Sequence, residues 1–202
     1  MKKQVLNAGS VELLDWMGGD KAIVRGGRIC YQSQGNALAD INLIKALVKN
    51  NHTSALEHAV FTFQVKAPIF VFRQWHRHRI GWSYNEKSLR YCEATPEFYV
   101  PDGLLDTTED FIKDSYSSSY ADYETLVKSG IPKEQARAVL PLGIYTEMVC
   151  TCNGASLLHF EDLRTSKHAQ KEIQDYTWAL LDCVKEVAPI YGEALETRLG
   201  RY

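Results

Sequence analysis

The sequence of 202 residues lacks any long apolar run. Residues 1–7 contain no signal-peptide core. No segment reaches the ~18 consecutive apolar residues that a membrane span needs. We therefore expect a protein with no membrane partner and a cytoplasmic location. Internal repeats, low-complexity tracts and long linkers are also missing, which predicts a single domain over residues 1–202.

The sequence also lacks an excess of charge of one sign. Lys and Arg total 23, Asp and Glu total 25, and the formal net charge is −2. Proteins that bind nucleic acid through a broad surface carry a strong excess of Lys and Arg over Asp and Glu. We therefore expect no nucleic-acid partner. The basic residues gather instead between residues 73 and 90, so the positive field is local.

Cysteine is scarce and unevenly spaced. There are five cysteines, an odd number, and no Cys-x-x-Cys pair. Cys150 and Cys152 lie too close together for a zinc knuckle, so no metal site is predicted. In the expected cytoplasmic setting a disulfide framework is unlikely to form, and reduced structural thiols are predicted. Because Cys150 and Cys152 alternate on an expected strand, both should face the same way.

Hydrophobic patterning predicts a few strands and several helices without βαβ alternation, and no Gly-x-Gly-x-x-Gly follows a strand. This pattern indicates an α+β fold with a mixed or antiparallel sheet and several helices. Asp20, Thr107 or Thr108, and Asn153 are predicted helix N-caps. Residues 4–14 are expected to form an edge strand or a hairpin, and further strands are expected at 61–66 and 144–152. The expected helices cover 20–29, 37–49, 68–75, 107–128, 153–164 and 168–187, with a short helix opened by Pro132.

Residues 73–91 are the most informative segment. They contain four arginines and two histidines, with tryptophan and tyrosine rings between them. A solvated charged face would not need so many rings, and a core could not bury so many unpaired guanidinium groups. Planar guanidinium forks set among aromatic rings suit a ligand that is both anionic and flat, such as a nucleotide or a flavin. The segment is therefore predicted to form the centre of an active site.

The same segment resembles a family signature. Arg77-His78-Arg79, followed by Ser88 and Arg90-Tyr91, is similar to the motif of the flavin-dependent thymidylate synthases, in which seven residues separate Arg-His-Arg from Ser. Here eight residues separate Arg79 from Ser88. The extra residue is expected near Gly81, since the residues from Tyr84 onward fit without a gap. Glycine tolerates unusual backbone dihedrals, so a local bulge is expected there.

Two further segments carry the resemblance. Residues 51–58 are similar to the family's His-x-[Thr/Ser]-x-x-Glu-His segment, which implies flavin contacts for His52 and Ser54. The alternative for Ser54 is the N-cap of a short helix, and Glu57 and His58 are expected to form hydrogen bonds inside the fold. Residues 153–164 resemble a third family segment, whose flavin-contacting positions correspond to Asn153 and His159. Ala155 stands where the family often has arginine, so one flavin contact is expected to be missing.

The resemblance also implies a division of roles. The implied cofactor-binding residues are His52, Ser54, Arg77, His78, Arg79, Glu86, Asn153 and His159. The implied substrate-binding residues are Gln74, Trp75, Arg77, Glu86, Ser88, Arg90, Arg137 and Arg164. Glu86, Ser88 and Arg90 alternate, so an extended segment would place them on one face. Arg164 is the expected catalytic residue, because a permanently charged guanidinium can stabilise negative charge on a uracil ring. The alternative for Arg164 is a cation that complements the helix dipole.

The activity that the resemblance implies is the reductive methylation of deoxyuridine monophosphate to thymidine monophosphate. Methylenetetrahydrofolate would donate the carbon, NADPH would be the reductant and FAD the bound cofactor of a single catalytic domain. The family also implies a homotetramer with active sites at subunit interfaces. Two other functions stay open: a flavin reductase or other flavoprotein, which would not need to bind uridylate, and a non-catalytic nucleotide-binding or RNA-binding regulator, which would not bind flavin.

Overall fold

The computed structural model describes residues 2–29, 32 and 34–200. One five-stranded sheet has the strand order β1-β2-β3-β5-β4, and every neighbouring pair is antiparallel. This topology confirms the α+β prediction and decides for the antiparallel form of the sheet. The strands are β1 (Lys2–Val5), β2 (Gly9–Met17), β3 (Val60–Pro68), β4 (Trp82–Glu86) and β5 (Tyr145–Asn153).

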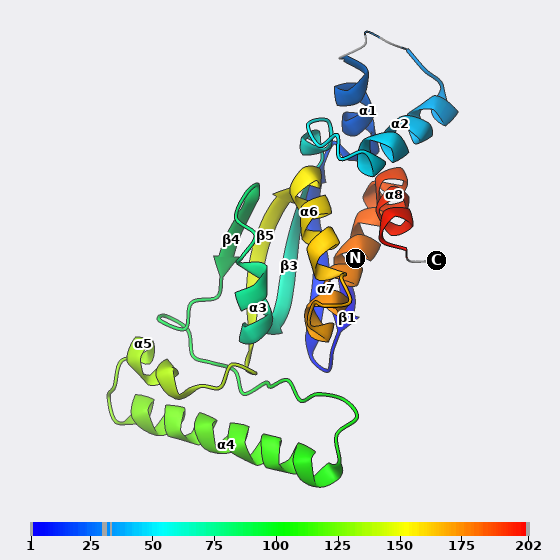
Figure 1. The fold of residues 1–202 in the computed structure, drawn as a ribbon. Coiled ribbons are helices and arrows are strands. Elements are labelled where there is room, and N and C mark those ends of the chain that lie inside the picture. Colours follow the sequence, from blue (N-terminus) through cyan, green and yellow to red (C-terminus); the bar gives the residue numbers. More distant parts are fainter. Residues whose placement is uncertain (1, 30–31, 33, 201–202) are drawn as a thin grey trace.

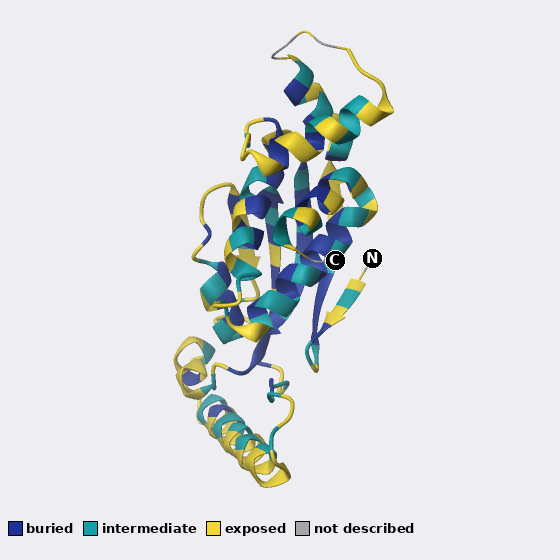
Figure 2. Ribbon diagram, turned by 45° about the vertical axis from the view of Figure 1, so that its right-hand side comes forward, coloured by how far each residue is buried: buried dark blue, intermediate teal, exposed yellow. Residues whose placement is uncertain are grey.

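Helices α3, α6 and α7 lie across one face of the sheet (Figure 1). Burial is concentrated in the central strands of the sheet and in these helices, whereas α4 lies away from them and is mostly exposed (Figure 2). No helix in the described part of the chain combines the length and apolar character needed to cross a membrane. The helices are α1 (Gly19–Ile29), α2 (Ala37–Lys49), α3 (Ile69–Trp75), α4 (Asp106–Lys128), α5 (Lys133–Ala136), α6 (Gly154–Arg164), α7 (Lys171–Val187) and α8 (Pro189–Leu199), with 3-10 turns η1 (Leu56–His58) and η2 (Arg137–Val139).

The central strands follow the alternation expected from their sequences. Phe61 and Phe63 of β3 are fully buried, as are Cys150 and Cys152 of β5, and Phe63 pairs with Cys150 across the two strands. Alternate residues of a strand face the same side, so these side chains form one apolar layer beneath the helices. Burial raises the pKa of the Cys150 thiol, which keeps it protonated and unreactive. The prediction that both thiols share one face is confirmed.

The remaining cysteines do not all fit the expected pattern. Cys183 is a buried free thiol, as predicted. Cys92 is also a free thiol, but it is exposed, because it follows the turn after Ser88 rather than a strand or a helix face. Cys30 lies outside the described residues.

Two predicted helix caps are wrong. The Asp20 carboxylate accepts hydrogen bonds from the amides of Ile190 and Tyr191, each at 2.9 Å, so it caps the start of α8 instead of its own helix. Helix α4 begins at Asp106 without a side-chain cap, and Thr107 and Thr108 lie inside its first turn. An acid or a hydroxyl near a helix start favours capping, but the sequence does not say which free amides it will face.

Two elements were missing from the sequence prediction. Residues 82–86, for which no strand was predicted, form β4, which pairs with β5 from Trp82 opposite Cys152 to Glu86 opposite Met148. Helix α8 was not expected, and α7 begins at Lys171 instead of residue 168. Both β4 and α8 depend on neighbours distant in sequence, and local propensity is easily overridden by such contacts. The predicted cap Asn153 is confirmed, since its Oδ1 accepts from the Ser156 amide at 2.8 Å.

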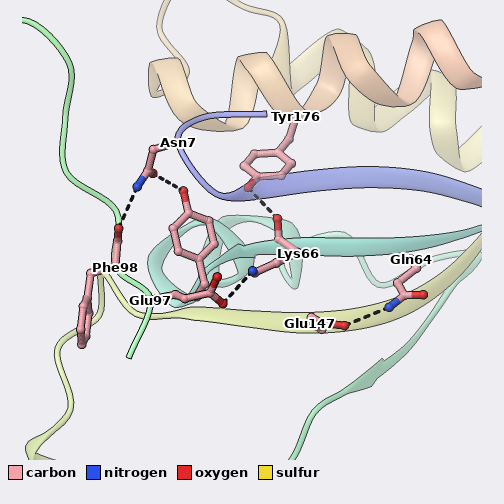
Figure 3. A network of polar contacts seen from close by, with 8 residues as sticks. Asn7, Gln64, Lys66, Glu97, Phe98, Glu147 and Tyr176 are labelled. Atoms are coloured by element: carbon pink, nitrogen blue, oxygen red, sulfur yellow. Dashed lines mark hydrogen bonds and ion pairs between the residues drawn. The ribbon is translucent and has the colours of Figure 1, made fainter. Parts of the chain in front are cut away.

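A polar network fastens the loop before α4 to the end of the sheet (Figure 3). Lys66 Nζ lies 2.7 Å from a carboxylate oxygen of Glu97. Asn7 donates to the carbonyl of Phe98 at 3.0 Å and accepts from the Tyr145 hydroxyl at 2.6 Å. These contacts join the β1–β2 turn, β3 and β5 to one loop. The lobe that holds α4 and α5 is therefore fixed relative to the sheet.

Candidate functional site

Residues 73–91 line two pockets. The first, which we call the Glu86 pocket, has a volume of about 610 Å³ and lies between the end of α3, the end of β4 and η2. Its polar lining residues are Arg73, His76, Glu86, Lys87, Ser88, Glu134 and Arg137. The second, the His78 pocket, has a volume of about 200 Å³ and is lined by Arg77, His78, Arg79, Ile80, Trp82, Ser156, His159, Leu163 and Arg164. The turn that carries the Arg-His-Arg motif (residues 76–81, the signature turn), the start of β4 and helix α6 thus supply the lining of the His78 pocket.

The Glu86 pocket brings together three residues of the predicted substrate set: Glu86, Ser88 and Arg137. Arg90 does not join them, because its Nε donates to Glu134 at 3.0 Å. The expected shared face of Glu86, Ser88 and Arg90 is also wrong. The chain turns after Glu86, and the amide of Tyr91 donates to the Ser88 carbonyl at 3.1 Å.

Glu86 is an acid surrounded by cations. Burial against the pocket wall raises its pKa, while His76, Arg73 and Arg137 act in the opposite direction. Its strand partner Met148 places Glu86 beside His76, whose Nε2 lies 3.3 Å from the Met148 sulfur. The pocket therefore combines two guanidinium groups with the carboxylate of Glu86, while its second carboxylate, Glu134, is paired with Arg90. This set suits an anionic ligand that also offers a hydrogen-bond donor.

In the His78 pocket, a hydrogen bond joins the signature turn to α6. Arg164 Nε donates to His78 Nε2 at 2.9 Å, and the same guanidinium donates to the Gln74 carbonyl at 3.1 Å. Burial lowers the pKa of His78 to about 4, with Arg164 and His159 adding to the effect. His78 is therefore a neutral ring at pH 7 that accepts at Nε2 and carries its proton on Nδ1.

Two residues of the predicted substrate set play different parts. Trp75 is fully buried, with its ring centroid 4.9 Å from that of Phe160, and it lines neither pocket. Its predicted contact with substrate is therefore not supported, because the ring fills the core beneath the site. Gln74 also lines neither pocket: its carbonyl accepts from Arg164 at 3.1 Å, and its side-chain amide donates to Gln170 at 2.8 Å.

The segment before η1 stands apart from both pockets. His52 and Ser54 are exposed and are among the lining residues of neither pocket. Ser54 does not cap η1, whose N-cap position is Ala55, so that alternative is wrong. Glu57 and His58 are exposed, and within residues 2–29, 32 and 34–200 neither side chain forms a hydrogen bond. The expected internal hydrogen bonds of these two residues are not found.

The glycine beside the predicted insertion adopts an unusual backbone conformation. Gly81 has φ of 67°, in the left-handed region that favours glycine. A Cβ at this position would lie only 2.1 Å from Ser156 Oγ. The same oxygen donates to the Ile80 carbonyl at 2.9 Å. The signature turn is thus packed directly against the first turn of α6, and only glycine fits.

Several residues that line these pockets were not predicted from the sequence. Arg73 and His76 line the Glu86 pocket from the end of α3. Their spacing of three residues places them on one side of a helix, a signal that was available in the sequence. Ser156 in the His78 pocket carried no such signal, because its role depends on the conformation of Gly81.

Comparison with known proteins decides the family. Residues 12–190 match the family model described as thymidylate synthase complementing protein. A flavin-dependent thymidylate synthase of Thermosipho africanus is 41% identical, over 96% of this chain and 93% of that protein. Another, of Thermotoga neapolitana, is 42% identical over 96% of this chain and 94% of that protein. The chain belongs to the flavin-dependent thymidylate synthase family.

A solved structure agrees with this assignment to the thymidylate synthase family. The UMP/dUMP methylase PolB of Streptomyces cacaoi, in its complex with 5-bromo-dUMP, superposes with a TM-score of 0.87. The two chains are 31% identical, and the match covers 98% of this chain and 99% of PolB. The predicted family, fold class and enzyme class, a methyltransferase, are therefore confirmed.

Proposed function

We propose that this enzyme methylates deoxyuridine monophosphate to thymidine monophosphate, with FAD as cofactor, methylenetetrahydrofolate as carbon donor and NADPH as reductant. The observation that carries the proposal is the contact of Arg164 with His78 at 2.9 Å, between the Arg-His-Arg turn and α6. It places a permanent cation among groups suited to a flat, anionic cofactor. We further propose that the enzyme acts in the cytoplasm.

The His78 pocket fits part of a flavin. Arg77 and Arg79 are exposed at its edge, where their guanidinium groups can bind the pyrophosphate of FAD. Trp82, Ile80 and Leu163 supply an apolar wall for a ring system. When bound, the reduced flavin would supply the hydride for the methyl group. The neutral His78 ring can face the flavin without adding a second cation beside Arg164.

The size of the His78 pocket supports a site shared between subunits. At about 200 Å³ it is smaller than the range of roughly 300–1,000 Å³ typical of small-molecule pockets. One chain therefore does not enclose a molecule as large as FAD. His52 and Ser54, which lie outside both pockets, are proposed to contact the flavin of another subunit, within a homotetramer. Asn153 is proposed to contact flavin through its amide nitrogen, because its Oδ1 caps α6.

The Glu86 pocket is proposed to hold the nucleotide. Arg73 and Arg137 would bind the phosphate, with the Ser88 hydroxyl as a further donor. Glu86 would accept a hydrogen bond from a ribose hydroxyl or a ring N–H. Arg90, paired with Glu134, would have to exchange that carboxylate for the phosphate to take its proposed part.

Arg164 is proposed to act on the uracil ring. Its guanidinium has five N–H groups, and two of them are used by His78 and Gln74, which leaves three for a substrate. These donors would stabilise the negative charge that develops on the ring as the new carbon bond forms. The chain's own part in the reaction is then to orient the ligands and to stabilise charge.

A visible spectrum tests the flavin part of the proposal. The purified protein, incubated with FAD and freed of excess, should be yellow, and NADPH should bleach it without oxygen. If the protein stays colourless and calorimetry shows no heat of FAD binding, the proposed function is contradicted. Bovine serum albumin treated in the same way controls for flavin that adheres nonspecifically.

A further inference from the structure

Two side chains outside the signature turn donate hydrogen bonds to its backbone carbonyls. The Tyr84 hydroxyl donates to the carbonyl of His78 at 2.5 Å. The Ser156 hydroxyl donates to the carbonyl of Ile80 at 2.9 Å. Tyr84 lies in β4 and Ser156 in α6. The turn at residues 76–81 is thereby tied to both elements that flank the His78 pocket.

Both hydroxyl groups are well placed to act as permanent donors. Burial raises the pKa of Tyr84, so its hydroxyl stays protonated at physiological pH. Its ring is stacked on Trp82, with centroids 5.8 Å apart and planes 9° apart, which fixes the direction of the hydroxyl. The backbone amide of Ser156 is already bound by Asn153. The Ser156 side chain is therefore free to serve the turn without a loss of helix capping.

The guanidinium groups of the turn are not held by ion pairs in the part of the chain that the structure describes. Arg77 and Arg79 are exposed, and among the described residues neither forms an ion pair. The positions of their guanidinium groups therefore depend on the backbone that carries them. Ordering a loose turn at the moment of binding costs conformational entropy, and a turn ordered in advance avoids that cost.

We propose that Ser156 and Tyr84 are positioning residues that hold the Arg-His-Arg turn in its ligand-binding conformation before a ligand arrives. The ligand, FAD, rests on the proposed function. Ser156 acts beside Gly81, where the extra residue relative to the family signature is expected. Its hydroxyl fills the space that a side chain at residue 81 would need. Tyr84 binds the carbonyl of His78, two residues before the Ile80 carbonyl that Ser156 binds.

The test compares four single variants with the unaltered protein. Ser156→Ala and Tyr84→Phe each remove one donor and keep the rest of the side chain. Ser156→Thr keeps a hydroxyl and should restore the behaviour of the unaltered protein. Ser117→Ala, on exposed α4, removes a hydroxyl that donates to the Lys113 carbonyl at 2.8 Å and serves as the matched control. Two quantities are measured: the Kd for FAD by calorimetry, and amide hydrogen exchange over residues 76–82 without ligand.

Loss of either donor should raise the Kd for FAD by about three- to tenfold, the effect of one net hydrogen bond. Exchange over residues 76–82 should accelerate in the same two variants, while it stays unchanged in Ser156→Thr and Ser117→Ala. The melting temperature should move by only about 2–4 °C, because each change removes a single hydrogen bond. A general structural role would instead speed exchange across α6 and β4 as well.

Exchange separates the failure of this proposal from the failure of the proposed function. If Ser156→Ala and Tyr84→Phe exchange like the unaltered protein and bind FAD equally well, the two residues position nothing and the proposal is overturned. If the unaltered protein does not bind FAD but the two variants still exchange faster over residues 76–82, the hold on the turn stands and the proposed function fails.

Discussion

Arg164→Ala should lower thymidylate formation by about 10²-fold or more, the usual cost of one preorganised electrostatic donor. Arg164 is the last residue of α6. Its guanidinium already donates hydrogen bonds to the His78 ring in the signature turn and to the Gln74 carbonyl in α3. Arg164→Lys should recover little activity. An ammonium group has no planar fork and cannot make both contacts while it also faces a substrate. Thymidylate formation, flavin reduction by NADPH and thermal stability should be measured on the same preparations.

The alternative role for Arg164, a cation at a helix end, leads to different results. It predicts a loss of about 0.3–1 kcal/mol in stability with little kinetic effect. Arg198→Ala is the matched control, because Arg198 makes a two-point contact with Asp162 at 2.8 Å and lines neither the Glu86 nor the His78 pocket. It should lower stability but spare the chemistry. Near-normal methylation by Arg164→Ala would remove Arg164 from the active site.

Glu161→Leu should raise the free energy of unfolding at pH 8 by about 1–3 kcal/mol, the cost of a buried polar group without partners. Glu161 lies on α6 with no solvent exposure, and within the described residues neither carboxylate oxygen has a hydrogen-bond partner. Burial raises its pKa well above the ordinary value of 4.5, and the nearby carboxyl groups of Asp162 and Glu196 add to the shift. Leucine has a similar volume and needs no partner.

The sign of the pH dependence follows from that raised pKa. The folded protein keeps the Glu161 proton at pH values where the unfolded chain has lost it. Below about pH 4.5 the proton is bound in both states, so the raised pKa of Glu161 costs no stability. Above that pH the free energy of unfolding falls as pH rises toward the folded-state pKa. Urea unfolding at pH 5 and pH 8 should show a larger gain from Glu161→Leu at pH 8.

Two further variants sharpen the Glu161 experiment. Glu161→Gln cannot ionise but keeps unpartnered polar atoms, so it should remove the pH dependence with a smaller gain than leucine. The exposed Glu57→Gln should change neither quantity. Equal stability of the unaltered protein and Glu161→Leu at both pH values would show that the carboxyl group finds partners in solution.

Local sequence signals predicted the elements that depend on local contacts. Helix α2 ends at Lys49, just before Asn50 and Asn51, as predicted. In β3 the side chains alternate between buried and half-buried, as the alternation of apolar and polar residues predicts. Strand β4 was missed because its sequence, Trp-Ser-Tyr-Asn-Glu, resembles a polar loop until β5 pairs with it. Asp20 was assigned to the wrong helix for the same reason, since only the folded chain brings α8 to it.

The candidate site was predictable to the extent that the family motifs carry it. Arg77, His78 and Arg79 line one pocket together with His159, which was assigned to the same cofactor, and with Arg164, which was assigned to the substrate. The motif could not show that Trp75 points into the core or that Arg90 pairs with Glu134, because side-chain direction and ion pairing depend on tertiary contacts. The hold of Ser156 on the turn was invisible for a similar reason, as it needs the left-handed backbone at Gly81.

The most direct test of the proposed function is product analysis after mixing the purified protein with deoxyuridine monophosphate, methylenetetrahydrofolate, FAD and NADPH. We expect thymidine monophosphate in proportion to the carbon donor consumed. No product should form when FAD or NADPH is omitted, and little should form with Arg164→Ala. NADPH oxidation and flavin bleaching without any methylated nucleotide would contradict this account and identify a flavin reductase instead.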